Sequence, residues 1–272
     1  MSASKQTIAF FGATGGCAGT ALAAALRDGY TCTALVRTPE KLRNILTNEH
    51  GISSVTLENL LTIHSGNVRD TSAVQKALVS PANPSILVDT IVFGVGAAAK
   101  MKASLTQPFT IDDPNVCEFG TRTVLESLSS LAKSGVSVTK DDRKPLYITV
   151  STTGISDKKR DVPAALYPLY HWTLKVPHED KKKMEHMIMT DNGANIRDFV
   201  IVRPTLLASE PVRGPTKVRA GWEWGVEARV EGEKEPGPQM GYQIGRTDVG
   251  EWIFREAIAK GGWEGKAVSL TY

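Results

Sequence analysis

A glycine-rich segment near the N-terminus has the residue types that bind the phosphates of a dinucleotide. Residues 11–19 read Phe-Gly-Ala-Thr-Gly-Gly-Cys-Ala-Gly and follow a short apolar run. Gly12 permits a tight turn, Gly15 lets the backbone approach a pyrophosphate with no Cβ in between, and the N–H groups of the next helix would point at the phosphate. The alternative is an ordinary tight connection between a strand and a helix. We predict nucleotide-binding roles for residues of this loop, namely Gly12, Thr14, Gly15, Gly16 and Cys17.

A basic residue after the second predicted strand bears on the identity of the dinucleotide. Arg37 follows Val36, at a position where an acidic residue commonly binds the ribose hydroxyls of NAD. A planar guanidinium instead matches the 2′-phosphate of NADP, which it can bind through two parallel hydrogen bonds. We therefore predict NADP(H) as the cofactor, with Arg37 as a cofactor-binding residue. The alternative is a surface arginine at the end of a strand.

Polar side chains follow the strand predicted at 145–150, and ligands of parallel sheets bind at the carboxyl ends of strands. Ser151 and Thr152 could hydrogen-bond a substrate oxygen, or could equally satisfy the backbone of their own loop. Tyr170 and His171 could donate or relay a proton, or could form a packed aromatic edge instead. We retain all four as candidate catalytic residues.

Strand and helix signals alternate along the chain, which predicts an α/β fold with a doubly wound parallel sheet and helices on both faces. Strands are expected at 7–11, 31–36, 60–64, 86–95, 145–150, 199–202 and 267–271. Helices are expected at 15–27, 38–48, 71–79, 178–190 and 247–259, and a long helix that Asp113 and Pro114 open runs to about residue 133. We predict one domain, 1–272, with 205–245 as an inserted flap on the substrate side.

Composition excludes several classes of protein. The 272 residues carry 32 basic and 29 acidic side chains, a balance that argues against nucleic acid or an anionic membrane as partner. The three cysteines match no disulfide or metal pattern, so we expect reduced thiols, no metal site and a cytoplasmic protein with no signal peptide. The stretch 7–26 has no charged residue, but its four glycines make it a poor candidate for a membrane helix.

The motifs together resemble those of the atypical short-chain dehydrogenase/reductase superfamily. Gly12-Ala-Thr-Gly15 with Arg37 is most similar to its NAD(P)H-binding group, which includes NmrA-like proteins and biliverdin reductase B. The resemblance implies a Rossmann fold and further cofactor contacts from Asn67, Val68, Gly94, Val95, Lys181 and Pro204. It is narrowest to small fungal members, some of which are linked to natural-product biosynthesis.

The resemblance also implies a catalytic dyad that the sequence lacks. Short-chain dehydrogenases place a lysine four residues after a tyrosine, so that the ammonium lowers the pKa of the phenol. Here His171 lies four residues after Tyr167, Leu174 lies four after Tyr170, and Lys175 lies five after Tyr170. The dyad is therefore absent or remodelled, and we add Lys175 to the catalytic candidates.

Three functions remain open at this point. The first is an NADPH-dependent reductase of a small apolar or aromatic molecule. The second is a non-redox isomerase, or an epoxide-rearranging or cyclising enzyme, on the same scaffold, which the missing dyad motivates. The third is an NmrA-like sensor that binds a dinucleotide and a protein partner. A redox-sensing role for Cys17 is a further hypothesis. The expected partner is a small molecule, and the expected assembly is a monomer or a homodimer.

Overall fold

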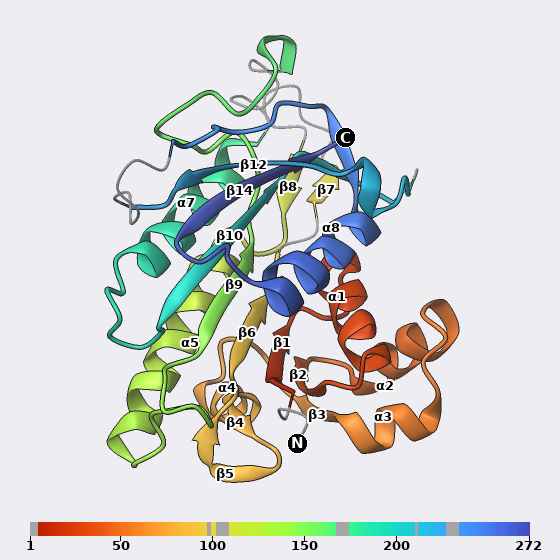
Figure 1. Cartoon of the computed structure of the whole chain (residues 1–272), viewed down its shortest axis with the longest axis vertical. Helices are drawn as coiled ribbons and strands as arrows, with labels where there is room; N and C mark the ends of the chain where they lie inside the picture. The colour runs from red at the N-terminus through yellow and green to blue at the C-terminus, as the bar shows by residue number, and fades with distance from the viewer. Residues whose placement is uncertain (1–4, 97–98, 102–108, 167–173, 210–211, 227–233) are drawn as a thin grey trace.

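An eight-stranded sheet forms the centre of the computed structural model, which describes residues 5–96, 99–101, 109–166, 174–209, 212–226 and 234–272 (Figure 1). The strand order is β12-β14-β10-β9-β6-β1-β2-β3, and every neighbouring pair is parallel except β12 with β14. The strands are β1 (Thr7–Phe11), β2 (Thr31–Val36), β3 (Leu61–Ser65), β6 (Thr90–Phe93), β9 (Leu146–Val150), β10 (Asp198–Pro204), β12 (Arg219–Trp224) and β14 (Lys266–Thr271). The predicted doubly wound α/β fold is confirmed.

Helices cover both faces of this sheet, because the strands are apolar on both sides. The helices are α1 (Gly16–Arg27), α2 (Pro39–Asn44), α3 (Ser54–Leu60), α4 (Thr71–Leu78), α5 (Val116–Lys133), α7 (Lys175–Met189) and α8 (Arg246–Trp252). Helices α1, α2, α3 and α8 pack on one face, and α4, α5 and α7 on the other. Two helices continue as wider turns over Ile45–Glu49 and Ile253–Lys260.

The centre of the sheet is a topological switch point. From β1 the chain passes to β2 on one side, and it later returns to β6 on the other side. The loops that leave β1 and β6 therefore separate at their carboxyl ends and leave a crevice. This is the end of the sheet at which the glycine-rich loop lies, between β1 and α1.

The region predicted as a flap contributes directly to the main sheet. Its strand β12 pairs antiparallel with β14, and Glu223 and Trp224 are buried there. A buried glutamate interrupts the apolar pattern by which a strand is recognised in sequence. Glu223 is tolerated in β12 because Arg203 on β10 neutralises it at an N–O distance of 2.5 Å. The same region also supplies β11 (Leu206–Ala208) and β13 (Gln243–Gly245), which pair with each other.

Several local predictions need correction. The long helix begins at Val116, not at Asp113, whose carboxylate forms an ion pair with Arg69 at 2.7 Å. Helix α3 was not predicted, although the Ser53 hydroxyl caps it by accepting from Thr56 N–H at 3.1 Å. The predicted loop after α4 is a hairpin of β4 (Val79–Ser80) and β5 (Asn83–Leu87), and β7 (Ala99–Met101) pairs with β8 (Phe109–Ile111). No helix in the described ranges is long and apolar enough to cross a membrane.

Candidate functional site

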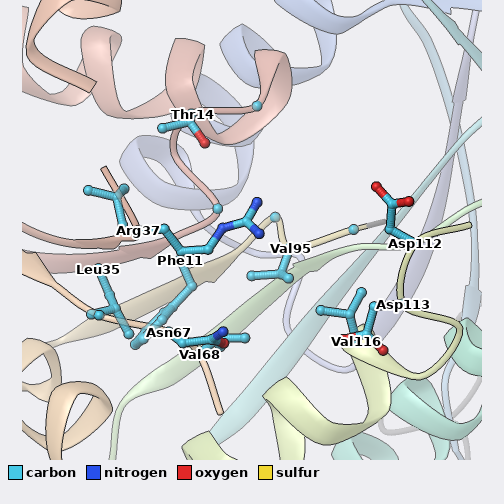
Figure 2. Close-up of a pocket in the computed structure, with 16 residues that line it drawn as sticks. Phe11, Thr14, Leu35, Arg37, Asn67, Val68, Val95, Asp112, Asp113 and Val116 are labelled. Carbon is cyan, nitrogen blue, oxygen red and sulfur yellow. The ribbon is translucent and has the colours of Figure 1, made fainter. Parts of the chain in front are cut away.

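A cavity of about 290 Å³ lies at the carboxyl ends of the central strands (Figure 2). Five segments that are distant in sequence line it: the turn after β1, the end of β2, the turn after β3, the loop after β6 and the residues 112–116 at the start of α5. The predicted residues among its lining are Gly12, Thr14, Gly15, Arg37, Asn67, Val68, Gly94 and Val95. Figure 2 shows the Arg37 side chain extending into this cavity. The structure therefore brings together eight residues that the sequence motifs singled out.

Gly12 adopts a conformation that side chains resist. Its φ is +80°, and a Cβ at this position would lie 2.7 Å from the carbonyl carbon of Gly94. Both facts require glycine, because the backbones after β1 and β6 approach each other here. The Gly15 N–H donates to the Gly12 carbonyl at 2.9 Å and closes the turn.

The N-terminus of α1 faces the cavities without a cap of its own. Its N-cap residue is Gly15, no side chain among the described residues caps its first N–H groups, and its first turn contains no acidic residue. Uncapped N–H groups and the positive end of the helix dipole favour an anion at this position. The cradle that Gly12 leaves open and this helix end both fit the pyrophosphate of a dinucleotide.

A second cavity, of about 470 Å³, continues from the first. The two share Gly15 and the turn at 94–96. The second cavity is lined further by Gly16, Cys17, Cys117, Val150, Ser151, Pro177, Asp180, Lys181, Leu207 and Arg246. An extended ligand could therefore run from Arg37, along the α1 N-terminus, to the end of β9.

Lys181 points into this second cavity rather than into solvent. Its ammonium donates to the carbonyl oxygens of Val150 at 2.6 Å and Val95 at 3.3 Å. Two of its three N–H donors are thereby accounted for. The hydroxyl of Ser151, in the same cavity, is buried and has no hydrogen-bond partner among the described residues. Lys181 and Ser151 thus bring an ammonium and an unpartnered hydroxyl to one cavity.

The residue four positions before Lys181 is Pro177, which lines the same cavity. Residues four apart lie on one face of a helix, so this is where the dyad would place its tyrosine. Proline offers no hydroxyl there. Pro177 and Lys181 therefore do not form a tyrosine–lysine pair on this helix.

Asp180, the residue before Lys181, joins α7 to the start of α5. Its buried carboxylate accepts from the backbone N–H groups of Cys117 at 3.0 Å and Glu118 at 2.8 Å. It thereby caps α5 in place of Asp113 and ties α7 to the start of that helix. This tertiary cap could not be predicted from local sequence, because 63 residues separate its two partners.

The thiols near the site are not activated. Burial raises the pKa of Cys17 to about 12, although the nearby charges of Arg246 and Lys181 act in the opposite direction. Burial likewise raises the pKa of Cys117 to about 11. Reactive cysteines carry lowered pKa values, so these thiols do not match the redox-sensing hypothesis for Cys17. All three cysteines are buried and unpaired.

Some predicted residues do not lie in the two cavities. Lys175 starts α7 with a side chain 73% exposed and pairs with Glu179 at 3.9 Å, so we correct its proposed catalytic role. The Thr152 hydroxyl donates to the Thr153 carbonyl at 3.1 Å and satisfies its own loop. Pro204 is buried in β10, and its carbonyl accepts a hydrogen bond from the Thr153 N–H at 3.0 Å. Tyr170 and His171 fall outside the described residues.

Sequence reasoning missed Leu207, Cys117, Pro177 and Arg246 as lining residues. The position of Pro177 could have been predicted from the sequence, because it lies four residues before Lys181 and so on the same face of a helix. Nothing local marks the other three, because their approach to the cavity depends on how β11, α5 and α8 pack. Among the described residues no group of three His, Cys, Asp or Glu side chains could hold a metal ion.

A family model described as NAD(P)H-binding matches residues 12–258, which include every residue that lines the two cavities except Phe11. The chain belongs to this NAD(P)H-binding family. Its cofactor is therefore a nicotinamide dinucleotide, and the residues of the glycine-rich loop, the α1 N-terminus and the second cavity fit that group. Such a cofactor supplies or accepts a hydride at its nicotinamide ring.

Two curated relatives match nearly the whole chain. "Reductase pytE" of Aspergillus terreus is 41% identical over 283 residues and covers 100% of both chains. "Oxidase pynE" of Aspergillus niger is 36% identical and covers 98% of this chain and 99% of its own. A solved Rossmann-fold NAD(P)-binding family protein from Shigella flexneri matches 99% of this chain and 94% of its own with a TM-score of 0.56. At 14% identity this last likeness shows the fold alone.

Proposed function

We propose that this protein is an NADPH-dependent reductase of a small, largely apolar or aromatic molecule. The observation that carries the proposal is the pair of joined cavities, with a cation at the far end of the first and an oxygen-binding pair in the second. The names of the two fungal relatives, a reductase and an oxidase, support redox chemistry.

Arg37 supports NADPH over NADH. Its side chain is exposed, lines the first cavity, and has no ion-pair partner among the described residues. The acidic Asp113 in the same cavity is neutralised by Arg69. A 2′-phosphate on the adenosine ribose would give the Arg37 guanidinium an anionic partner.

At the other end of the site, Lys181 and Ser151 would bind the oxygen of a substrate carbonyl. The third N–H of the Lys181 ammonium can donate to that oxygen and deliver the proton that a reduced carbonyl requires. Ser151 satisfies its buried hydroxyl by bonding to the same oxygen. Pro177 and Leu207 give the pocket an apolar side that suits a hydrocarbon or aromatic body.

Titration with NADPH and NADH, followed by turnover assays with a panel of aromatic aldehydes, ketones and quinones, tests this function. We expect NADPH to bind more tightly than NADH by about tenfold to a hundredfold, the value of charge-assisted hydrogen bonds. We also expect substrate-dependent loss of reduced-nicotinamide absorbance. Arg37→Met should abolish the preference and leave NADH affinity unchanged. A product of unchanged oxidation level, or binding without turnover of any compound, would contradict the reductase.

A further inference from the structure

Arg246 begins α8 and lies over the first residue of α1, more than two hundred residues earlier in the chain. Figure 1 shows these two helices side by side. The contact is close: a Cβ at Gly16 would lie 2.8 Å from Cδ and 2.9 Å from Cβ of Arg246. Glycine at position 16 therefore makes room for the aliphatic stem of this arginine. Arg246 also lines the second cavity beside Gly15 and Cys17.

The charge of Arg246 is placed where a cation is unfavourable by itself. The N-terminus of α1 is the positive end of a helix dipole, and it has no acidic side chain in its first turn. Within the described ranges no carboxylate lies at ion-pair distance from the Arg246 guanidinium, which donates a long hydrogen bond of 3.5 Å to the Ser209 hydroxyl. An anion between the guanidinium and the helix end would satisfy both.

The backbone on either side of Arg246 is held in place. The Tyr272 hydroxyl accepts from the Gly245 N–H at 2.9 Å and donates to the Asp248 carboxylate. Asp248 also accepts from the N–H groups of Arg213 at 2.8 Å and Gly214 at 3.1 Å. The arginine is therefore presented from a fixed segment, which lowers the entropic cost of ligand binding.

We infer that Arg246 is a pyrophosphate-binding residue, which holds the dinucleotide at the N-terminus of α1 beside the glycine-rich loop. The inference rests on the proposed nucleotide site and adds to it. The site then contains two arginines with separate roles. Arg37 recognises the 2′-phosphate, which only NADP(H) carries, and Arg246 recognises the pyrophosphate, which NAD(H) and NADP(H) share.

Calorimetric titration of the full chain with four ligands separates these roles. Arg246→Met keeps an aliphatic stem over Gly16 and removes the charge, and Arg37→Met is the matched control at the other end. For Arg246→Met we expect NADPH, NADH and ADP-ribose each to bind about tenfold to a hundredfold more weakly. Affinity for 2′-AMP, which has no pyrophosphate, should be unchanged. Arg37→Met should weaken NADPH and 2′-AMP and leave NADH and ADP-ribose unchanged.

A second variant, and the salt dependence of ADP-ribose binding, distinguish loss of the Arg246 charge from loss of folding. Arg246→Lys retains the charge and should retain most of the ADP-ribose affinity, which shows that charge rather than folding is responsible. The affinity of Arg246→Met for ADP-ribose should also depend less on salt than that of the wild type. Undiminished binding of NADH and ADP-ribose by Arg246→Met, with normal binding by the wild type, would overturn this inference alone. A wild type that binds none of the four ligands would overturn the proposed function as well.

Discussion

Lys181 and Lys175 lie on the same helix but in different environments. Lys181 is inside the second cavity and bonded to two strand-end carbonyls, whereas Lys175 is exposed and pairs with Glu179 on the next turn. Six residues separate them, which rotates one about 240° from the other around the helix. Position on the helix, and not residue type, therefore distinguishes the candidate catalytic lysine from a surface lysine.

Replacing each lysine by methionine tests this distinction. Lys181→Met should lower kcat by about 10²- to 10⁴-fold, the usual contribution of a positioned acid or base. Lys175→Met should leave kcat unchanged, because its side chain points into solvent. Initial rates over a range of pH measure both, and NADPH titrations separate loss of binding from loss of proton transfer. Equal effects of the two variants would contradict the assignment.

Asp161 is a buried carboxyl close to the Arg203 guanidinium and Glu223. Burial is the largest influence on it and raises its pKa, the Gly154 N–H and Arg203 act to lower it, and the charge of Glu223 raises it further. The folded state therefore keeps the Asp161 proton to a higher pH than the unfolded state does. Its stabilising contribution is present below the unfolded pKa and is lost as pH rises through the folded pKa.

Asp161→Asn provides the corresponding test. An amide cannot ionise, so the variant should gain stability relative to the wild type as pH rises from acid to neutral. The amide oxygen can still accept from the Gly154 N–H. Urea unfolding of both proteins at several pH values measures the difference in free energy of unfolding. A difference that does not change with pH would show that Asp161 has no raised pKa in the folded protein.

At the scale of elements, the turn between β1 and α1 is where backbone geometry and ligand binding meet. Gly12 is needed for its positive φ and also for the close approach of the β6 loop. Gly51 also has a positive φ, of +66°, but a Cβ there would meet nothing within 4 Å. A substitution at Gly51 therefore measures the cost of the positive φ alone, and one at Gly12 measures that cost together with a steric clash.

Gly51→Ala should cost about 1–2 kcal/mol of stability, the value of the left-handed conformation for an L-residue. Gly12→Ala should cost more than Gly51→Ala, and should also abolish dinucleotide binding, because the loops after β1 and β6 must separate. Chemical denaturation and NADPH titration measure the two effects. If Gly12→Ala bound NADPH normally, the cradle would not be the nucleotide site.

Element order along the chain was predicted well and element ends less well. The ends of strands β1 and β2 were predicted to the residue. Gly12 ends the apolar run of β1, and Gly29 ends the helical segment that precedes β2. The start of α5 was wrong by three residues, since the side chain that caps it, Asp180, comes from α7. Local signals predict elements whose ends are capped locally, and they fail where another element supplies the cap.

At the scale of the whole molecule, a buried group of charges joins the sheet to the helix that carries Lys181. Arg203 on β10 bonds through two nitrogens to Glu185 on α7, at 3.1 and 2.6 Å, and through a third to Glu223 on β12. All three side chains are buried. The cluster therefore fixes β12 and α7 relative to the carboxyl end of β10.

Removing its central cation leaves two buried carboxylates without compensation. Arg203→Met should cost about 3–5 kcal/mol, the value for breaking a buried pair. Arg255→Met, which breaks an exposed pair with Glu251 at 2.9 Å, should cost at most about 1 kcal/mol. Guanidinium unfolding curves of the two variants and the wild type measure these costs. Equal costs would show that burial does not control the contribution of this cluster.

The sequence by itself determined seven of the eight strands of the main sheet, the glycine-rich loop and the cation at the end of β2. These depend on contacts within a few residues: a positive φ at Gly12, an uncapped helix start, a residue directly after a strand. Only the tertiary structure decided what faces them. Arg246 contacts Gly16, Pro177 and Lys181 line one cavity with Ser151, and Arg203 forms an ion pair with Glu223. Such contacts depend on the packing of elements far apart along the chain, and no local spacing records how those elements meet.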